Sequence, residues 1–145
     1  MKVIVIHGPN LNLLGSREPD VYGRETLDDV NDRIQAAAKE MDAEISFHQT
    51  AREGEIIELL HAGIGTVDGA LLNPAGYSHT SRAIADAVRA VPFPVVEVHL
   101  SNIHAREPWR RRSVTAEAAA GIVSGFGTGS YIAGLYALKG LLDTR

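Results

Sequence analysis

Five short apolar segments, separated by stretches with helical spacing, constrain the fold of this chain more than any other feature. They occupy residues 2–7, 44–49, 69–73, 95–99 and 121–124, and each has the length and composition of a β-strand. The third is apolar enough to be buried on both faces, as in a parallel sheet. Regular alternation of strands and helices predicts an α/β fold with a parallel sheet covered by helices on both faces.

The intervening segments show the three-four spacing of amphipathic helices. A capping box of Thr26 and Asp29 opens the first, which runs to Met41. Pro92 and Pro94 stop a later one, because neither proline can continue a helix. The predicted helices cover residues 27–41, 55–61, 80 or 81 to 91, and 130–142.

Length and charge limit the class of protein. The chain has 145 residues, 45% of them hydrophobic, which suits a single domain spanning residues 1–145. Its net charge of -4 argues against a nucleic-acid partner, and it has no cysteine for disulfide or thiolate chemistry. No apolar run approaches the roughly twenty residues of a membrane span, and no signal-peptide pattern precedes the first strand. We therefore expect no membrane partner and a cytoplasmic protein.

The first loop, His7–Gly23, is much longer than the usual linker of about two to six residues. Its glycines and prolines predict irregular structure without helix. Gly15 and Gly23 provide hinge points for a lid that carries Arg17 and Tyr22. A cation beside a phenol favours the phenolate, which is a base. The alternative is an exposed loop in which both side chains merely cover the core.

Polar side chains gather in the loops that follow the first, third and fourth strands. In an open parallel sheet, ligands bind outside the carboxyl ends of the strands, where these three loops would meet. We therefore predict one site built from Asn10, Arg17 and Tyr22; Asn73, Ser78 and His79; and His99, Ser101, Asn102, His104 and Arg106.

Glu97 and His99 are two residues apart on a predicted strand, so both side chains point to the same face. A carboxylate beside an imidazole raises the imidazole pKa and fixes the ring, which suits a general acid. Each candidate also has a plainer explanation. His79 could be a helix N-terminal residue that faces water, and His99 could cap the end of a strand. Asn73 could shape its turn, and Asp86 could be a solvated charge on a helix.

Asp86 is the candidate furthest from the predicted site. It lies about two turns into the helix after His79, roughly 10 Å along the axis from its own loop. Ala83, Ala87 and Ala90 give this helix small apolar positions that permit close packing. We therefore expect an oligomer in which Asp86 serves the site of a neighbouring subunit.

The sequence disfavours a metal ion and a dinucleotide as ligands, and it leaves the role of one basic segment open. Arg106 and residues 110–112 form a basic run, which is either a solvated face or a binding site for a small polar ligand. The six histidines are scattered without metal-binding spacing, so no metal is expected. The glycine-rich segment 125–129 comes too late in the chain for a dinucleotide-binding unit, and we interpret it as a tight turn.

Three long motifs resemble those of the type II 3-dehydroquinate dehydratases, in the same order along the chain. They are Gly8-Pro9-Asn10-Leu11-Asn12-Leu13-Leu14-Gly15-x-Arg17-Glu18-Pro19-x-x-Tyr22-Gly23, Asn73-Pro74-Ala75-Gly76-Tyr77-Ser78-His79-Thr80-Ser81, and Glu97-Val98-His99-Leu100-Ser101-Asn102-Ile103-His104-Ala105-Arg106-Glu107. The length and element order also fit. The resemblance therefore covers nearly the whole chain.

This resemblance implies a flavodoxin-like three-layer sandwich with a five-stranded parallel sheet. It also implies cofactor-free dehydration of 3-dehydroquinate to 3-dehydroshikimate, a step of the shikimate pathway to aromatic amino acids. In the family, an anionic tyrosine forms an enolate and a histidine protonates the leaving hydroxyl, by net anti elimination. The family assembles as trimers with shared sites, four of which form a dodecamer.

Carried over residue by residue, the resemblance assigns roles to twelve positions. Tyr22 is the base, His99 the acid, and Arg17 the residue that favours the tyrosinate. Asn10 helps to stabilise the enolate and Glu97 supports the histidine. The remaining seven are Arg106, as a second cation near the tyrosine, and the substrate-binding positions Asn73, His79, Asp86, Leu100, Ser101 and Arg110.

Simple electrostatics agrees with this assignment. A free tyrosine has a pKa of about 10, too high for a base at neutral pH. A unit charge at 4 Å contributes roughly 4 kcal/mol at an effective dielectric of 20, or up to about three pKa units. One arginine therefore suffices only with good geometry and little water, and a second cation or a closed lid would help.

The chain departs from the family pattern at two places, and one alternative class of protein has to be considered. The family often has Ala75 and Gly76 in the opposite order, which predicts a reshaped turn after Asn73. Pro108-Trp109 beside the arginines is the other departure. The rival is a non-catalytic flavodoxin-like binding or receiver domain. A receiver would need an acidic cluster and a phosphorylatable aspartate at the strand ends, where this chain has His7, Asn73 and His99.

Overall fold

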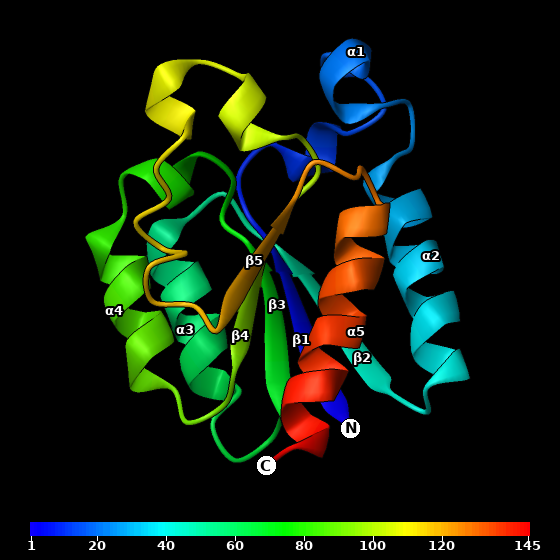
Figure 1. Ribbon diagram of the computed structural model, residues 1–145, viewed down its shortest axis with the longest axis vertical. Helices are drawn as coiled ribbons and strands as arrows, with labels where there is room; N and C mark the ends of the chain where they lie inside the picture. Colours follow the sequence, from blue (N-terminus) through cyan, green and yellow to red (C-terminus); the bar gives the residue numbers. More distant parts are fainter.

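A single five-stranded sheet forms the centre of the computed structural model, which describes all of residues 1–145 (Figure 1). Every neighbouring pair of strands is parallel, in the order β2-β1-β3-β4-β5. This is the flavodoxin-like order, and it confirms the expected α/β fold. The strands have the predicted bounds: β1 (Lys2–His7), β2 (Glu44–Gln49), β3 (Gly69–Asn73), β4 (Val95–His99) and β5 (Gly121–Ser124).

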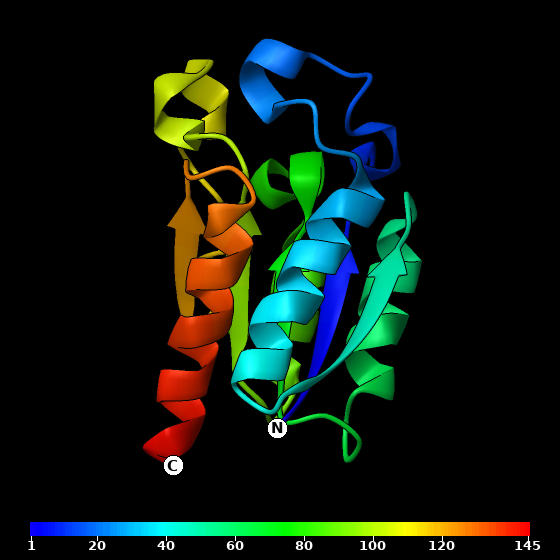
Figure 2. The same ribbon diagram turned by 90° about the vertical axis from the view of Figure 1, so that its right-hand side faces the viewer.

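Four helices cover the sheet and complete three layers (Figure 1), and Figure 2 looks onto one of the two helical layers. One face is covered by α2 (Leu27–Glu40) and α5 (Gly129–Asp143), and the other by α3 (Glu53–Ala62) and α4 (Arg82–Ala90). The predicted capping box opens α2, and the Ser81 hydroxyl caps α4 by accepting the N–H of Ile84 at 3.0 Å. That bond settles the choice between residues 80 and 81.

The period-two alternation of the strands divides the core into two clusters. Val3 and Val5 of β1 point toward α2 and α5, whereas Ile4 and Ile6 point toward α3 and α4. All four side chains are at most 5% exposed. Because both faces of the central strands are buried, the strands are apolar almost throughout, as the sequence predicts.

The structure differs from the sequence prediction in the first loop. The expectation of no helix there is wrong, since the loop contains a 3-10 turn at Leu11–Leu13 and one α-helical turn, α1 (Pro19–Tyr22). Pro19 favours the first position of a helix, where its missing N–H needs no partner. The helices α3 and α5 also begin slightly earlier than predicted, because capping and fraying make helix ends hard to place from sequence.

The loops after β1, β3 and β4 begin at the carboxyl end of the sheet, and both termini lie at the opposite end (Figure 1). The strand order reverses between β1 and β3, where a crevice forms in folds of this kind. The loops after β1, β3 and β4 therefore meet at one edge, as predicted. No helix in the structure has the length and apolar character to cross a membrane.

Gly8 joins two of these loops by direct backbone contact. Its N–H donates to the carbonyl oxygen of Asn73 at 2.8 Å. A Cβ atom on Gly8 would lie 2.8 Å from the carbonyl carbon and oxygen of Pro74, closer than side chains approach backbone. Only glycine therefore lets the loop after β1 pack against the loop after β3.

We predict that Gly8→Ala lowers the free energy of unfolding by about 1–3 kcal/mol, the usual effect of overpacking. Gly140→Ala is the matched control, since Gly140 is exposed within α5 and a Cβ there meets nothing within 4 Å. The control should gain about 0.5–1 kcal/mol of helix stability. Urea unfolding of both variants tests this, and equal midpoints for Gly8→Ala and wild type would contradict it.

Candidate active site

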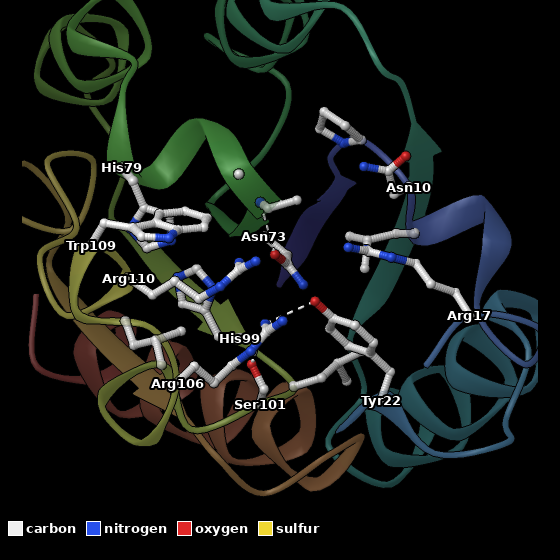
Figure 3. Close-up of a pocket in the computed structure, with 16 residues that line it drawn as sticks. Asn10, Arg17, Tyr22, Asn73, His79, His99, Ser101, Arg106, Trp109 and Arg110 are labelled. Carbon is white, nitrogen blue, oxygen red and sulfur yellow. Dashed lines mark hydrogen bonds between the residues drawn. The ribbon is translucent and has the colours of Figure 1, made fainter. Parts of the chain in front are cut away.

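The loops after β1, β3 and β4 enclose a polar pocket of about 210 Å³ (Figure 3). Of the twelve site residues that the resemblance assigns, ten line this pocket: Asn10, Arg17, Tyr22, Asn73, His79, His99, Leu100, Ser101, Arg106 and Arg110. Glu97 lies directly behind one of them. Asp86 does not reach the pocket of its own chain.

Tyr22 contacts two arginines. Nη1 of Arg106 donates to the phenolic oxygen at 2.8 Å, as the dashed line in Figure 3 shows. The guanidinium carbons of Arg17 and Arg106 lie 4.8 and 5.1 Å from the centre of the tyrosine ring. The cation that touches the oxygen is therefore Arg106, whereas Arg17, from the same loop as the tyrosine, lies over the ring.

Glu18 lies close to both cations. Its Oε2 is 3.8 Å from Nη2 of Arg17 and 3.9 Å from Nη2 of Arg106, and its side chain is 54% exposed. Pairs this long and this exposed contribute little energy. The two guanidinium groups therefore keep most of their charge available to an anion in the pocket.

His99 and Glu97 form the predicted pair on one face of β4. Nε2 of His99 donates to Oε2 of Glu97 at 2.8 Å, and both side chains are buried. The same carboxylate accepts hydrogen bonds from the hydroxyls of Ser113, at 2.6 Å, and Thr115. The carboxylate of Glu97 therefore accepts from three donors, and one of these donors is the imidazole ring that it orients. Nδ1 of His99 has no partner within the chain and is left for the pocket.

The wall of the pocket that faces Arg17 and Tyr22 is formed by His79, Trp109 and Arg110 (Figure 3). Nδ1 of His79 donates to the carbonyl oxygen of Arg112 at 2.8 Å, which fixes the ring. The indole of Trp109 lies edge-on to this imidazole at 5.3 Å, and the guanidinium of Arg110 lies 4.1 Å from the indole centre. Trp109 therefore braces two predicted substrate-binding side chains.

The turn after Asn73 carries the departure from the family pattern. Ala75 adopts a φ of 53°, in the left-handed region that favours glycine. The Asn73 side chain supports this turn, since its Oδ1 accepts the N–H of Ala75 at 3.1 Å. The Ala75-Gly76 order thus places a side chain where the backbone prefers none, at a strain of about 1 kcal/mol.

Behind Asn73, the buried side chains of Tyr131 and His7 and the half-buried side chain of Asn31 form a hydrogen-bonded series. The Tyr131 hydroxyl accepts from Nδ2 of Asn73 at 3.1 Å and lies 2.8 Å from Nδ1 of His7. Nε2 of His7 lies 2.8 Å from Oδ1 of Asn31. Burial lowers the pKa of His7 from 6.5 to about 4, and it raises the pKa of Tyr131. Both side chains are therefore neutral near pH 7.

Several residues that line or support the pocket were not predicted from the sequence as site residues. Trp109 and Ile103 line the pocket, while Ser113, Thr115 and Tyr131 hold the residues that line it. For Ile103 and Trp109, the position inside or beside the third motif was the available signal. Tyr131 lies 58 residues from Asn73 in the chain, and no local pattern connects the two.

Asp86 lies on the outer side of α4, where its side chain is 81% exposed and pairs with Arg89 at 3.3 Å. It borders a surface depression lined by Arg82, Ala85, Arg89, Arg112, Val114 and Glu117. The structure contains no cluster of three or more His, Cys, Asp or Glu side chains that could hold a metal ion.

Fold and site together define an α/β protein of flavodoxin-like topology whose pocket holds an arginine-bound tyrosine and a carboxylate-bound histidine, groups suited to proton transfer. The chain belongs to the family Dehydroquinase class II, whose model matches residues 1–139. This family comprises 3-dehydroquinate dehydratases and acts in the shikimate pathway.

Relatives and solved structures agree with the family. The chain is 56% identical to the 3-dehydroquinate dehydratase of Desulforudis audaxviator over 143 residues, which cover 99% of this chain and 95% of the relative. It is 50% identical to that of Aliarcobacter butzleri, covering 99% and 87%. The crystal structure of type II dehydroquinase from Butyrivibrio crossotus superposes with a TM-score of 0.94 at 38% identity, covering 96% of this chain and 97% of that one.

We predict that His7 makes the folded chain sensitive to mild acid. Its pKa is about 4 when folded and 6.5 in the reference state, so below pH 6.5 the unfolded chain binds a proton that the folded chain does not. The stabilisation is complete above pH 6.5 and is lost as the pH falls toward 4. By linkage, the loss from this group at pH 5 is roughly 2 kcal/mol.

The measurement is the free energy of unfolding at pH 7.5 and pH 5 for wild type and His7→Gln. Glutamine offers a donor and an acceptor but does not titrate. The variant should lose roughly 2 kcal/mol less than wild type between the two pH values. An identical loss for both proteins would show that His7 is not the titrating group.

Proposed function

We propose that this chain dehydrates 3-dehydroquinate to 3-dehydroshikimate by anti elimination through an enolate. The observation that carries the proposal is the hydrogen bond from Arg106 to the phenolic oxygen of Tyr22, in a pocket that His99 also lines. Membership of the class II dehydroquinases and the names of the relatives support the choice of substrate.

In the proposed mechanism, the phenolate of Tyr22 removes a proton from the carbon next to the substrate ketone. The electrons of the broken C–H bond form an enolate. When the enolate collapses, they form the new C=C bond, and the C–O bond at the neighbouring carbon breaks. Protonated His99 gives its proton to the departing hydroxyl, which leaves as water. Transfer of the proton from Tyr22 back to His99, directly or through solvent, restores both groups.

Charge makes each group competent for its step. The guanidinium groups of Arg17 and Arg106 lie within about 5 Å of the Tyr22 ring and stabilise the phenolate. Glu97 stabilises the protonated imidazole of His99 and fixes the ring nitrogen that faces the pocket. Asn10, at the start of the first loop, is assigned to the enolate through an ordered water.

The remaining wall residues are assigned to binding. The side chains of Asn73, His79 and Arg110 and the backbone at Leu100 and Ser101 would hold the substrate's carboxylate and hydroxyls. The pocket provides arginines for a carboxylate and neutral donors and acceptors for hydroxyls. No cofactor or metal takes part in this proposal. Ultraviolet absorption of the conjugated enone after addition of 3-dehydroquinate tests the activity directly, and its absence would favour the binding-domain alternative.

We predict that Tyr22→Phe lowers kcat by at least about a hundredfold, the effect of losing one acid-base group. Tyr136→Phe is the control, since Tyr136 is 53% exposed on α5 and lies away from the pocket. The control should keep wild-type kcat. A Tyr22→Phe enzyme with more than a few per cent of wild-type kcat would remove Tyr22 from the role of base.

We also propose that the working unit is an oligomer built from trimers, with four trimers in a dodecamer, and that Asp86 completes a neighbour's site. Asp86 is exposed and does not reach its own pocket, which fits a role in trans. The expectation that Ala83, Ala87 and Ala90 form one apolar packing face beside Asp86 is wrong. Ala83 and Ala90 are exposed, but Ala87 packs into the core under α4. The exposed surface around Asp86 is therefore charged rather than apolar.

Subunit mixing tests the shared site. Tyr22→Phe and Asp86→Ala are each expected to be inactive, but a mixed oligomer contains sites with an intact Tyr22 and a neighbour's intact Asp86. Random mixing of equal amounts should restore about a quarter of the wild-type activity in a closed symmetric assembly.

The control mixes Tyr22→Phe with His99→Ala, whose residues line the same pocket of one chain. Every site then lacks one group, and no activity should return. Failure of the first pair to recover, despite mixing proven by mass, would end the shared-site proposal. A monomer by sedimentation would end the oligomer proposal as well.

A cytoplasmic location remains a prediction from sequence.

A further inference from the structure

The pocket wall at Asn73 is supported by polar groups that the proposed mechanism does not use. From the pocket inward, Asn73 contacts the Tyr131 hydroxyl at 3.1 Å, Tyr131 contacts Nδ1 of His7 at 2.8 Å, and Nε2 of His7 contacts Asn31 at 2.8 Å. Tyr131 and His7 are both 0% exposed. Of the four residues, only Asn73 lines the pocket, at its centre in Figure 3.

One backbone group fixes the orientation of the Asn73 amide, and one consistent set of hydrogen-bond directions follows from it through Tyr131 and His7 to Asn31. The N–H of Ala75 is an unambiguous donor, so the Asn73 atom that faces it, at 3.1 Å, is the carbonyl Oδ1. The amide nitrogen of Asn73 therefore faces Tyr131 and donates to its oxygen.

The hydroxyl hydrogen of Tyr131 is then free to point at Nδ1 of His7, which accepts it. A neutral imidazole that accepts at Nδ1 carries its hydrogen on Nε2, and that hydrogen points at Oδ1 of Asn31. In this series of hydrogen bonds from Asn73 to Asn31, each donor meets an acceptor, and each bond is consistent with the next. The orientation of Asn73 is thus fixed at both ends of its amide.

We propose that His7 and Tyr131 are positioning residues that hold the Asn73 amide in one orientation toward the substrate. With Oδ1 on Ala75 and one hydrogen of Nδ2 on Tyr131, the amide presents its second N–H and its second carbonyl lone pair to the pocket in a fixed order. A hydroxyl-bearing substrate meets one donor and one acceptor that cannot exchange places. This inference rests on the proposed function, in which Asn73 contacts the substrate.

A purely structural role predicts different behaviour. The ring of Tyr131 is part of the apolar cluster between the sheet and α5, so removal of the whole side chain would damage packing. Removal of the hydroxyl alone leaves that packing in place. If the hydroxyl serves only the fold, its loss lowers stability and leaves the kinetics of the folded enzyme unchanged.

The first test is Tyr131→Phe, with Tyr136→Phe on the same helix as the matched control. We expect kcat/KM for 3-dehydroquinate to fall about three- to tenfold in Tyr131→Phe, the worth of one hydrogen bond, with the larger part in KM. The control should stay within about twofold of wild type. Equal kinetics for both variants would overturn the proposal.

A double-mutant cycle identifies the group through which Tyr131 acts. Asn73→Ala should lower kcat/KM at least as much as Tyr131→Phe, and the double variant should be no worse than Asn73→Ala alone. If the two effects instead multiply, Tyr131 acts on something other than Asn73 and the proposal fails. Circular dichroism and oligomer mass are measured on each variant.

His7 provides a second test that does not depend on the folding of Tyr131→Phe. Glutamine at this position keeps a donor and an acceptor, whereas leucine keeps the volume and removes both. We expect His7→Gln to retain most of the wild-type kcat/KM and His7→Leu to lose as much as Tyr131→Phe. Equal kinetics for the two His7 variants would contradict a positioning role.

The outcomes also separate this inference from the proposed function. A wild-type enzyme that does not dehydrate 3-dehydroquinate would refute the function. Normal kinetics for Asn73→Ala would remove Asn73 from the site, and the inference with it. Impaired Asn73→Ala together with unimpaired Tyr131→Phe and His7→Leu would refute only the positioning role, with the proposed function intact.

Discussion

The backbone contact between Gly8 and the Asn73–Pro74 segment is the constraint on which the rest of the site depends. It joins the loop after β1 to the loop after β3 where the strand order reverses, through a 2.8 Å hydrogen bond and without room for a side chain. Because the two loops are held together, Asn10, Arg17 and Tyr22 on one side face a wall that begins at Asn73. The third loop then closes the pocket from β4.

Within this frame, buried or half-buried charges determine the chemistry. Three donors surround the carboxylate of Glu97, so it holds His99 without an arginine or lysine as partner. On the other side, two arginines lie beside Tyr22, and one exposed glutamate lies near both arginines. The anion lies behind the pocket and orients the histidine, whereas the cations line the pocket beside the tyrosine.

The site depends on contacts that differ greatly in how well a sequence reveals them. Glu97 and His99 are two residues apart on a strand, and the period-two geometry of a strand made their pairing predictable. The contact from Arg106 to Tyr22 spans 84 residues. The resemblance brought both residues into the site, but it gave the main role to Arg17, whereas the packing of the third loop places Arg106 on the oxygen. The carboxyl-end loops are irregular, so no periodic pattern predicts which cation lies nearest.

The sequence by itself determined the elements and the site's location. Apolar runs with strand length, helical spacing between them and proline stops specified all five strands and the α/β class, because these patterns reflect local backbone geometry and burial. Polar residues at three strand ends specified the edge of the sheet where the pocket forms. Only the tertiary structure decided the short helix at Pro19–Tyr22, the left-handed Ala75, and the chain from Asn73 through Tyr131 to His7. That chain joins residues 124 positions apart, and such pairs meet only when α5 packs against the sheet.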